Sequence, residues 1–178
     1  MTKVFVMLIS VIYIILGIII SIFFFYFIKE IFSIFSAHNP LLSPDWWETA
    51  TPAMVEDVLK KGYSVKEKSK EGRTALMFAV MCNKYQYPEA MDEVIKNIIK
   101  YGANVNEKDN YGNTPLTLAV GNNVNPRVIE ALIDNGADVK EKNGVGWTPL
   151  FIAKTFNPNL RIMETLIMYG ADDKNNEN

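Results

Sequence analysis

The strongest constraint on this chain of 178 residues is a short phrase that returns at long intervals. The phrase is five residues long and reads Gly-x-Thr-Pro-Leu, with alanine in place of proline in the first copy. It begins at Gly72, Gly112 and Gly146. Successive copies lie 40 and 34 residues apart. Because periods of this length are typical of chains that stack one small unit on the next, the sequence predicts a repeat architecture.

Each copy of the phrase has the chemistry of a helix start. Thr114 and Thr148 suit the N-cap position, where a hydroxyl accepts a hydrogen bond from an amide of the first turn. Pro115 and Pro149 follow at the first helical position, where no N–H is missed. Ala75 replaces proline in the first copy, a change that a helix start tolerates. We therefore expect a helix to begin at every copy.

A second phrase runs in step with the first and ends in Gly62, Gly102, Gly136 and Gly170. The positions eight, seven, four and three residues before each glycine are all apolar. They are Met54, Val55, Val58, Leu59, Val94, Ile95, Ile98, Ile99, Val128, Ile129, Leu132, Ile133, Ile162, Met163, Leu166 and Ile167. This spacing predicts a short helix with one buried stripe, ended by a glycine in the left-handed conformation.

Together the two phrases resemble the ankyrin repeat, whose first helix opens with Thr-Pro-Leu and whose second helix closes with Gly-Ala-Asp or Gly-Ala-Asn. The resemblance covers residues 46–173. It implies an all-α ankyrin-repeat solenoid of helix-turn-helix units joined by β-hairpin-like turns. This chain departs from the family where a histidine usually follows the leucine, because Met77, Thr117 and Phe151 stand there. It therefore lacks the side chain that hydrogen-bonds the neighbouring turn.

The repeat period divides the chain into expected units. These are an N-terminal capping half-repeat at 44–68, a repeat at 69–108 with an insertion between its helices, repeats at 109–142 and 143–175, and a disordered tail at 176–178. The half-repeat lacks the full phrase, as an end unit should, because its outer face has no neighbour. Trp46 and Trp47 are expected to cover this end of the core, with a place in the membrane interface as the alternative.

The N-terminal segment differs sharply in composition from the repeats. Residues 4–28 contain no charge and no proline, and 19 of these 25 residues are Ile, Leu, Phe or Val. As a helix the segment would be about 37 Å long, which exceeds a hydrocarbon core of about 30 Å. We expect an uncleaved transmembrane helix at 4–28 and a juxtamembrane spacer at 29–43. A cleaved secretory signal is the alternative, although Phe35 stands where its cleavage site needs a small residue.

The location of the repeats rests on few charges. Lys3 and the α-amine precede the apolar segment and Lys29 follows it, which slightly favours an N-terminus inside and repeats on the extracytoplasmic side. Frequent Asn, Lys and Ile suit an AT-rich genome, and we expect a bacterial source.

The sequence offers no candidate catalytic, cofactor-binding or metal-binding residues. Its one histidine, His38, lies in the spacer, and its one cysteine is Cys82. These cannot assemble the usual acid–base or zinc sites. The net charge is −2 and no basic stripe is present, so nucleic acid is not an expected partner. We expect no enzymatic activity, no cofactor and no small-molecule substrate.

The resemblance implies a protein partner, because ankyrin repeats usually dock partners on a concave surface of turn tips and first-helix flanks. Carried over by position, the candidate partner-binding residues are Lys70, Glu71, Arg73, Asn110, Tyr111, Asn113, Asn122, Trp147 and Phe156. Among these, Arg73, Tyr111 and Trp147 are of the types that dominate binding hot spots. An equally open alternative is that Trp147 and Phe156 only shield the C-terminal end of the stack.

These expectations combine into one functional hypothesis, a membrane-tethered and non-catalytic protein-interaction module. Its partner could itself be a membrane or envelope protein. Two alternatives stay open. One is an assembly protein recognised through its transmembrane helix, and the other is a secreted ankyrin-repeat effector whose N-terminal segment is removed.

Overall fold

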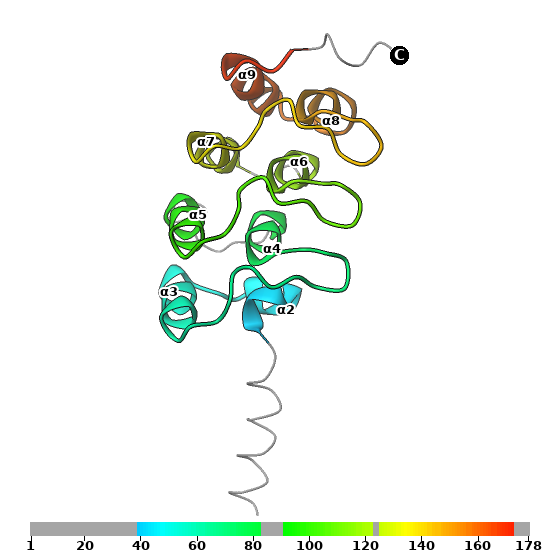
Figure 1. The fold of residues 1–178 in the computed structure, drawn as a ribbon. Helices are drawn as coiled ribbons and strands as arrows, with labels where there is room; N and C mark the ends of the chain where they lie inside the picture. Colours follow the sequence, from blue (N-terminus) through cyan, green and yellow to red (C-terminus); the bar gives the residue numbers. More distant parts are fainter. Residues whose placement is uncertain (1–38, 83–90, 123–124, 173–178) are drawn as a thin grey trace, which may run out of the picture. The chain divides into compact units, whose positions relative to one another are not determined.

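The computed structural model describes residues 39–82, 91–122 and 125–172 (Figure 1). By its internal contacts the chain divides into two units, residues 1–38 and 39–178, and only the second contains described residues. The predicted membrane segment 4–28, the residues 83–90 of the predicted insertion and the tail 176–178 lie outside the described residues. Within the described ranges, no helix combines the length and the apolar character needed to cross a bilayer.

The described residues form helices and turns, and none of them lies in a β-strand. The elements are η1 (Pro40–Leu42), α2 (Pro44–Trp47), α3 (Pro52–Lys60), α4 (Ala75–Met81), α5 (Met91–Lys100), α6 (Pro115–Gly121), α7 (Pro126–Asp134), α8 (Pro149–Phe156) and α9 (Leu160–Met168). They lie in two columns, with α2, α4, α6 and α8 in one and α3, α5, α7 and α9 in the other (Figure 1). Each helix packs against its column neighbours, and α4, α6 and α8 also pack against α5, α7 and α9 of their own layers.

The helices α4, α6 and α8 begin where the repeated phrase predicts. Each is preceded by a threonine whose hydroxyl accepts a hydrogen bond from the third helical amide, at 3.4 Å for Thr74, 3.2 Å for Thr114 and 3.2 Å for Thr148. Such a cap satisfies one of the amides that the first turn leaves unpaired. The local chemistry of the phrase thus sets the first residue of every helix in this part of the column.

Two of the residues that stand in place of the family histidine cap the start of their own helix. The Oγ1 atom of Thr117 accepts the amide of Thr114 at 2.8 Å, which closes a reciprocal capping box. The Sδ atom of Met77 lies 3.5 Å from the amide of Thr74, a weaker version of the same contact. Phe151 has no polar side-chain atom to offer. The strength of this capping contact therefore differs between layers: Thr117 makes it well, Met77 weakly, and Phe151 does not make it.

The second-column helices end at the predicted glycines, as the layer at Gly136 illustrates. Gly136 has a φ angle of +93° and donates its amide to the carbonyl of Ile133 at 2.9 Å. The next amide, of Ala137, reaches back to the carbonyl of Leu132 at 3.0 Å. These two bonds satisfy carbonyls at the helix end, and the positive φ that they require is available to glycine without strain.

The predicted apolar stripe forms most of the core, with two exceptions. Eleven of its sixteen residues are buried, and Ile99, Ile133 and Met163 are half-buried. Met54 and Ile167 are 40% and 54% exposed, which corrects the expectation that all sixteen point inward. Met54 belongs to α3, the first helix of its column, and Ile167 belongs to α9, the last. Each therefore lies on the side of its helix that has no neighbouring layer.

The N-terminal end of the stack is closed by η1 and α2. Leu41 is 0% exposed, Trp47 is 1% exposed, and the Trp47 indole donates to the Leu41 carbonyl at 2.9 Å. The Asn39 side chain also donates to the carbonyl of Ser64 at 2.7 Å. The folded unit thus begins at Asn39, inside the segment 29–43 that was expected to be a spacer. Pro40 and Pro44 led to the prediction of a loop here, but Leu41, which lies between them, is buried.

Candidate interaction surface

Each turn between layers is closed by one polar side chain, at the position three residues before the glycine of the first phrase. Asp109 is 6% exposed, and its Oδ1 atom accepts the amides of Tyr111 at 2.9 Å and Asn113 at 2.8 Å. Ser69 and Asn143 accept the equivalent amides in the other two turns. Sequence reasoning missed these residues. The available signal was a Ser, Asp or Asn at that position, since these side chains form such turns.

Adjacent turns are joined to each other through their backbones. The Asn110 amide donates to the carbonyl of Glu71 at 3.0 Å, and the Gly144 amide donates to the carbonyl of Tyr111 at 2.9 Å. The Asn110 side chain adds a bond to the carbonyl of Lys70 at 2.9 Å. The turns project from the column of α4, α6 and α8 (Figure 1). The structure therefore brings Lys70, Glu71, Asn110 and Tyr111 together along one row of turn tips.

The side chains on this row are largely open to solvent. Lys70, Glu71 and Asn110 are exposed, and Tyr111 is 63% exposed. The Ser69 hydroxyl donates to the Glu71 carboxylate at 2.8 Å, and this bond holds the pKa of Glu71 below its ordinary value. The row thus presents the ammonium group of Lys70, the carboxylate of Glu71, the amide of Asn110 and the phenol of Tyr111. The turns that carry these groups are hydrogen-bonded to one another.

Three of the predicted residues are half-buried and contribute in part to the support itself. The Asn113 side chain donates to Asp109 at 3.2 Å and accepts from the Asn143 side chain at 3.2 Å, so it bridges two turns. Asn122 donates to a backbone carbonyl of its own helix at 2.7 Å. The Nε atom of Arg73 is buried without a hydrogen-bond partner among the described residues. The polar atoms of Asn113 and Asn122 are therefore already engaged.

Trp147 and Phe156 lie together in the last layer and share an aromatic cluster with Phe151. The Trp147 ring centroid is 5.2 Å from that of Phe156 and 5.5 Å from that of Phe151, and both pairs are tilted. Trp147 is 37% exposed and Phe156 is 54% exposed. Contacts of this kind stabilise aromatic pairs beyond their burial. Trp147 is thus both anchored in its layer and open on one side.

Ion pairs also link successive turns, a feature that sequence reasoning did not single out. The pairs are Lys68 with Glu107, Lys108 with Glu141 at 2.6 Å, and Lys140 with Asp172 at 3.0 Å. The bond from Lys68 is the main reason that the pKa of Glu107 lies below its ordinary value. All three pairs are partly exposed, so each adds little to stability by itself.

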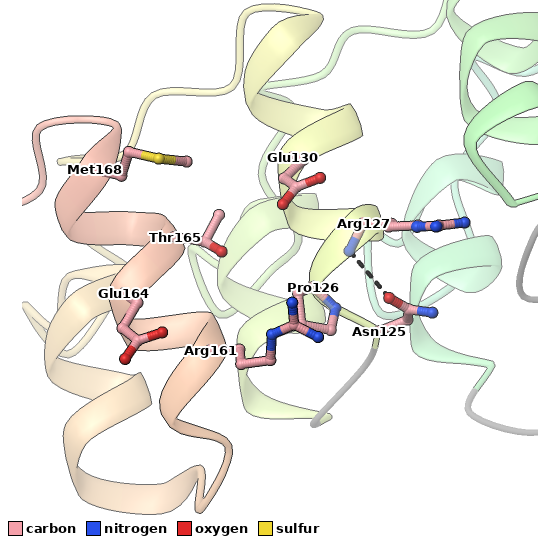
Figure 2. Close-up of a pocket in the computed structure, with 8 residues that line it drawn as sticks. All are labelled: Asn125, Pro126, Arg127, Glu130, Arg161, Glu164, Thr165 and Met168. Atoms are coloured by element: carbon pink, nitrogen blue, oxygen red, sulfur yellow. Dashed lines mark hydrogen bonds between the residues drawn. The ribbon is translucent and has the colours of Figure 1, made fainter.

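A pocket lies elsewhere, between α7 and α9 (Figure 2). Arg127 and Glu130 of α7 and Arg161 and Glu164 of α9 line it, together with Asn125, Pro126, Thr165 and Met168. Its two cations and two anions balance, so its charge selects no ligand class. None of the nine candidate residues lines it. In the described part of the chain no three His, Cys, Asp or Glu residues gather as a metal site would require.

A comparison with protein families decides what this stack of helix pairs is. The family model described as ankyrin repeats in three copies matches residues 49–143 and, in an overlapping match, residues 85–178. The chain belongs to the ankyrin-repeat family. Curated proteins yield no match to it.

Membership of the ankyrin-repeat family indicates a protein–protein interaction module. Members of this family are typically non-catalytic, and the expectation of no enzymatic activity agrees with that general property. The ankyrin turns and first helices are also the elements that carry all nine candidate residues. The match extends to none of the residues before 49, so it leaves the N-terminal segment 4–28 as a prediction.

Proposed function

We propose that this ankyrin-repeat chain binds a protein partner along its row of turn tips and holds that partner at a membrane through residues 4–28. The observation that supports binding at the tips is the combination of exposed side chains with turns that are already hydrogen-bonded to one another. A surface that is ordered before binding loses little conformational freedom when a partner docks. Contacts made at the tips should therefore contribute to affinity with little loss to the cost of ordering the surface.

The chemistry of the tips favours a partner with a mixed surface. Tyr111 offers a large ring with a polar end, and Lys70 and Glu71 on the preceding turn tip carry opposite charges. Such a set can contact an apolar side chain through the ring and charged groups of either sign on the neighbouring tip. We expect a folded or extended protein segment with an exposed apolar residue to occupy this row.

The membrane part of the proposal rests on the length and composition of residues 4–28. An anchor would confine the ankyrin repeats to a thin layer near the bilayer, which raises their effective concentration toward a membrane or envelope partner. The small excess of positive charge before the segment favours an extracytoplasmic position for the repeats.

The binding surface can be tested by placing a photo-crosslinking amino acid at Tyr111 in the full chain and irradiating native membranes. We expect a discrete adduct with one protein. The matched control is the same amino acid at Glu56, which is exposed on α3 in the other column. Adducts of equal yield at both positions, or at Glu56 alone, would show that the turn tips are not the binding surface.

Substitution of the exposed aromatic residues should separate binding from folding. Because Tyr111 is 63% exposed, Tyr111→Ala should leave the free energy of unfolding within about 1 kcal/mol while weakening partner binding about 10-fold or more. Trp147→Ala should behave in the same way if Trp147 is a binding residue. A loss of several kcal/mol in Trp147→Ala would instead assign this residue to the support of the last layer.

The tether can be tested with the fragment 39–178, which contains η1 and thus the buried Leu41. Under the proposal the fragment still binds the partner identified by crosslinking, but no longer sediments with membranes. Loss of partner binding in the fragment would favour recognition through the transmembrane helix. The intact mass of the mature chain tests the remaining alternative. If a signal is removed, residues 1–37 should be missing and the mature chain should begin after Ala37.

A further inference from the structure

We propose that the row of turn tips recognises an extended segment of its partner with an acidic residue at one end and an apolar residue about five or six positions away. This inference rests on the proposed function, because it names the chemistry of the partner that the tips bind. The acidic residue lies over the turn that precedes α4, and the apolar residue lies over the turn that precedes α8, two layers further along the stack (Figure 1).

The charges of the row are confined to one of its tips. The comparison takes the same positions in every layer: the two residues before the glycine of the first phrase, the residue after it, and the two residues at the end of the first helix. The turn before α4 supplies Lys70, Glu71 and Arg73, and these positions hold no other charged residue in any layer. The other members are Met81, Cys82, Asn110, Tyr111, Asn113, Gly121, Asn122, Gly144, Val145, Trp147, Thr155 and Phe156.

The two cations of the first tip have no partner of their own. In the described part of the chain, the side chains of Lys70 and Arg73 form neither a hydrogen bond nor an ion pair. Lys68 and Lys108 differ, since each contacts a carboxylate of the next turn. A carboxylate can accept two parallel bonds from the terminal nitrogens of a guanidinium. An acidic residue of a partner therefore meets two cations that the fold itself leaves unused.

Glu71 does not cancel this attraction. Its carboxylate accepts the Ser69 hydroxyl at 2.8 Å, which is the main cause of its lowered pKa, and the charges of Arg73 and Lys70 contribute least to that shift. The tip therefore carries two positive charges and one negative charge that is engaged within its own turn. A tip with this net positive charge favours an acidic residue over a basic one.

The other end of the row is apolar at the tip itself. At the position before the glycine of the phrase, Glu71 is exposed, Tyr111 is 63% exposed and Val145 is 68% exposed. Exposure at this position is thus a property of every tip and does not result from lying in the last layer. Val145 and the adjacent Trp147 together offer an aliphatic and an aromatic surface to an apolar side chain.

The distance between the two ends sets the length of the segment. The turns are joined in the order of the layers, through the bond from the Asn110 amide to the Glu71 carbonyl and the bond from the Gly144 amide to the Tyr111 carbonyl. Packed helices lie about 8–10 Å apart, so two layers span about 16–20 Å. An extended chain advances about 3.3 Å per residue, so about five or six residues cover this distance. Such a segment passes Tyr111 midway.

Selection from a random library of peptides of about 12 residues, twice the expected length, tests the proposal on the immobilised full chain in neutral detergent. We expect the enriched peptides to carry Asp or Glu about five or six positions from an aliphatic or aromatic residue. Lys70→Glu should abolish the preference for the acidic residue. Lys100→Glu is the matched control, because Lys100 is exposed at the end of α5 in the other column. An equal loss in both variants would indicate attraction by overall charge and overturn the proposal.

Two further variants test the ends of the row separately. An enriched peptide should bind Arg73→Gln about 10-fold more weakly than the wild type. Val145→Ser should weaken the preference for the apolar residue but not that for the acidic one. Far-ultraviolet circular dichroism checks that the variants stay folded.

The outcomes separate this inference from the proposed function. Enriched peptides without an acidic residue, or no enriched peptides at all, would overturn the inference. The proposed function would still stand in either case if photo-crosslinking at position 111 captures a protein in native membranes.

Discussion

At the scale of single residues, each turn depends on one side-chain acceptor, which is buried in the case of Asp109 and half-buried in the cases of Ser69 and Asn143. Asp109 is the clearest case, because one carboxylate oxygen accepts two backbone amides within 2.9 Å and the side chain is 6% exposed. Its other oxygen accepts the side-chain amide of Asn113 at 3.2 Å. Removing such an acceptor leaves two partly buried amides without this partner, which costs more than the bonds themselves contribute. Asp109 thus helps to fix the backbone of Tyr111 at the tip, together with the bond from the Gly144 amide.

We therefore expect Asp109→Ala to lower the free energy of unfolding by about 2–4 kcal/mol, measured by urea denaturation of the fragment 39–178. Asp109→Asn is the control, because an asparagine already performs this task at position 143 and keeps one carbonyl acceptor. It should recover most of the loss. An alanine variant as stable as the wild type would show that the turn is held by its backbone bonds alone.

At the scale of elements, the turns contact each other so closely that several positions in them exclude a side chain, as Gly112 and Gly144 illustrate. Gly112 has a φ of +75°, and a Cβ atom there would lie 2.5 Å from the Gly144 amide. A Cβ atom at Gly144 would lie 2.3 Å from the Tyr111 carbonyl oxygen. Backbone atoms cannot move aside as the end of a flexible side chain can, so these glycines permit the bond between turns.

The pair Gly112→Ala and Gly146→Ala separates this contact from backbone strain. Both glycines have positive φ, at +75° and +88°, so each substitution should cost about 1–2 kcal/mol through strain. Only the first adds a collision with the next turn, for which we expect a further 1–3 kcal/mol. Thermal denaturation of both variants measures the difference. Equal losses would mean that the turns can separate at little cost.

At the scale of the whole stack, the layers are joined by apolar burial inside and by lysine–carboxylate pairs along the turns. Glu107 has a lowered pKa because Lys68 donates to it, so the folded state binds its proton less tightly than the unfolded state does. Its contribution to stability is therefore present above the pKa of the unfolded chain and is lost as the pH falls through the lower, folded pKa. The stack should therefore lose stability as the pH falls below about 4.5, the ordinary pKa of a glutamate.

We expect Glu107→Gln to reduce this dependence on pH between neutral and acidic conditions, measured as the urea midpoint of the fragment 39–178 at a series of pH values. Added salt should diminish the same difference, since the pair is partly exposed. Lys60 and Glu56 form a pair within one helix and supply the control for an ion pair that joins no layers. An unchanged pH profile in Glu107→Gln would mean that other carboxylates dominate the acid response.

The sequence alone predicted the helix starts and helix ends that depend on neighbours along the chain. The starts of α6 and α8 follow from Thr114-Pro115 and Thr148-Pro149, and the ends of second-column helices follow from glycines such as Gly136. Caps, fixed φ angles and helical spacing act over a few residues, so they can be read without knowing the fold. The candidate residues, carried over from the family resemblance, lie on turns and at the ends of first helices, and their binding role stays a proposal.

Only the tertiary structure decided which apolar residues have a neighbour and which polar side chains are already occupied. Met54 and Ile167 fit the helical pattern as well as Ile95 does, but they face the open ends of the stack and Ile95 is 0% exposed. Leu41 is buried by contacts with helices that follow it, and the side-chain oxygen of Asn113 accepts a hydrogen bond from Asn143, 30 positions away. Burial and pairing depend on what another part of the chain places opposite, and no local pattern contains that information.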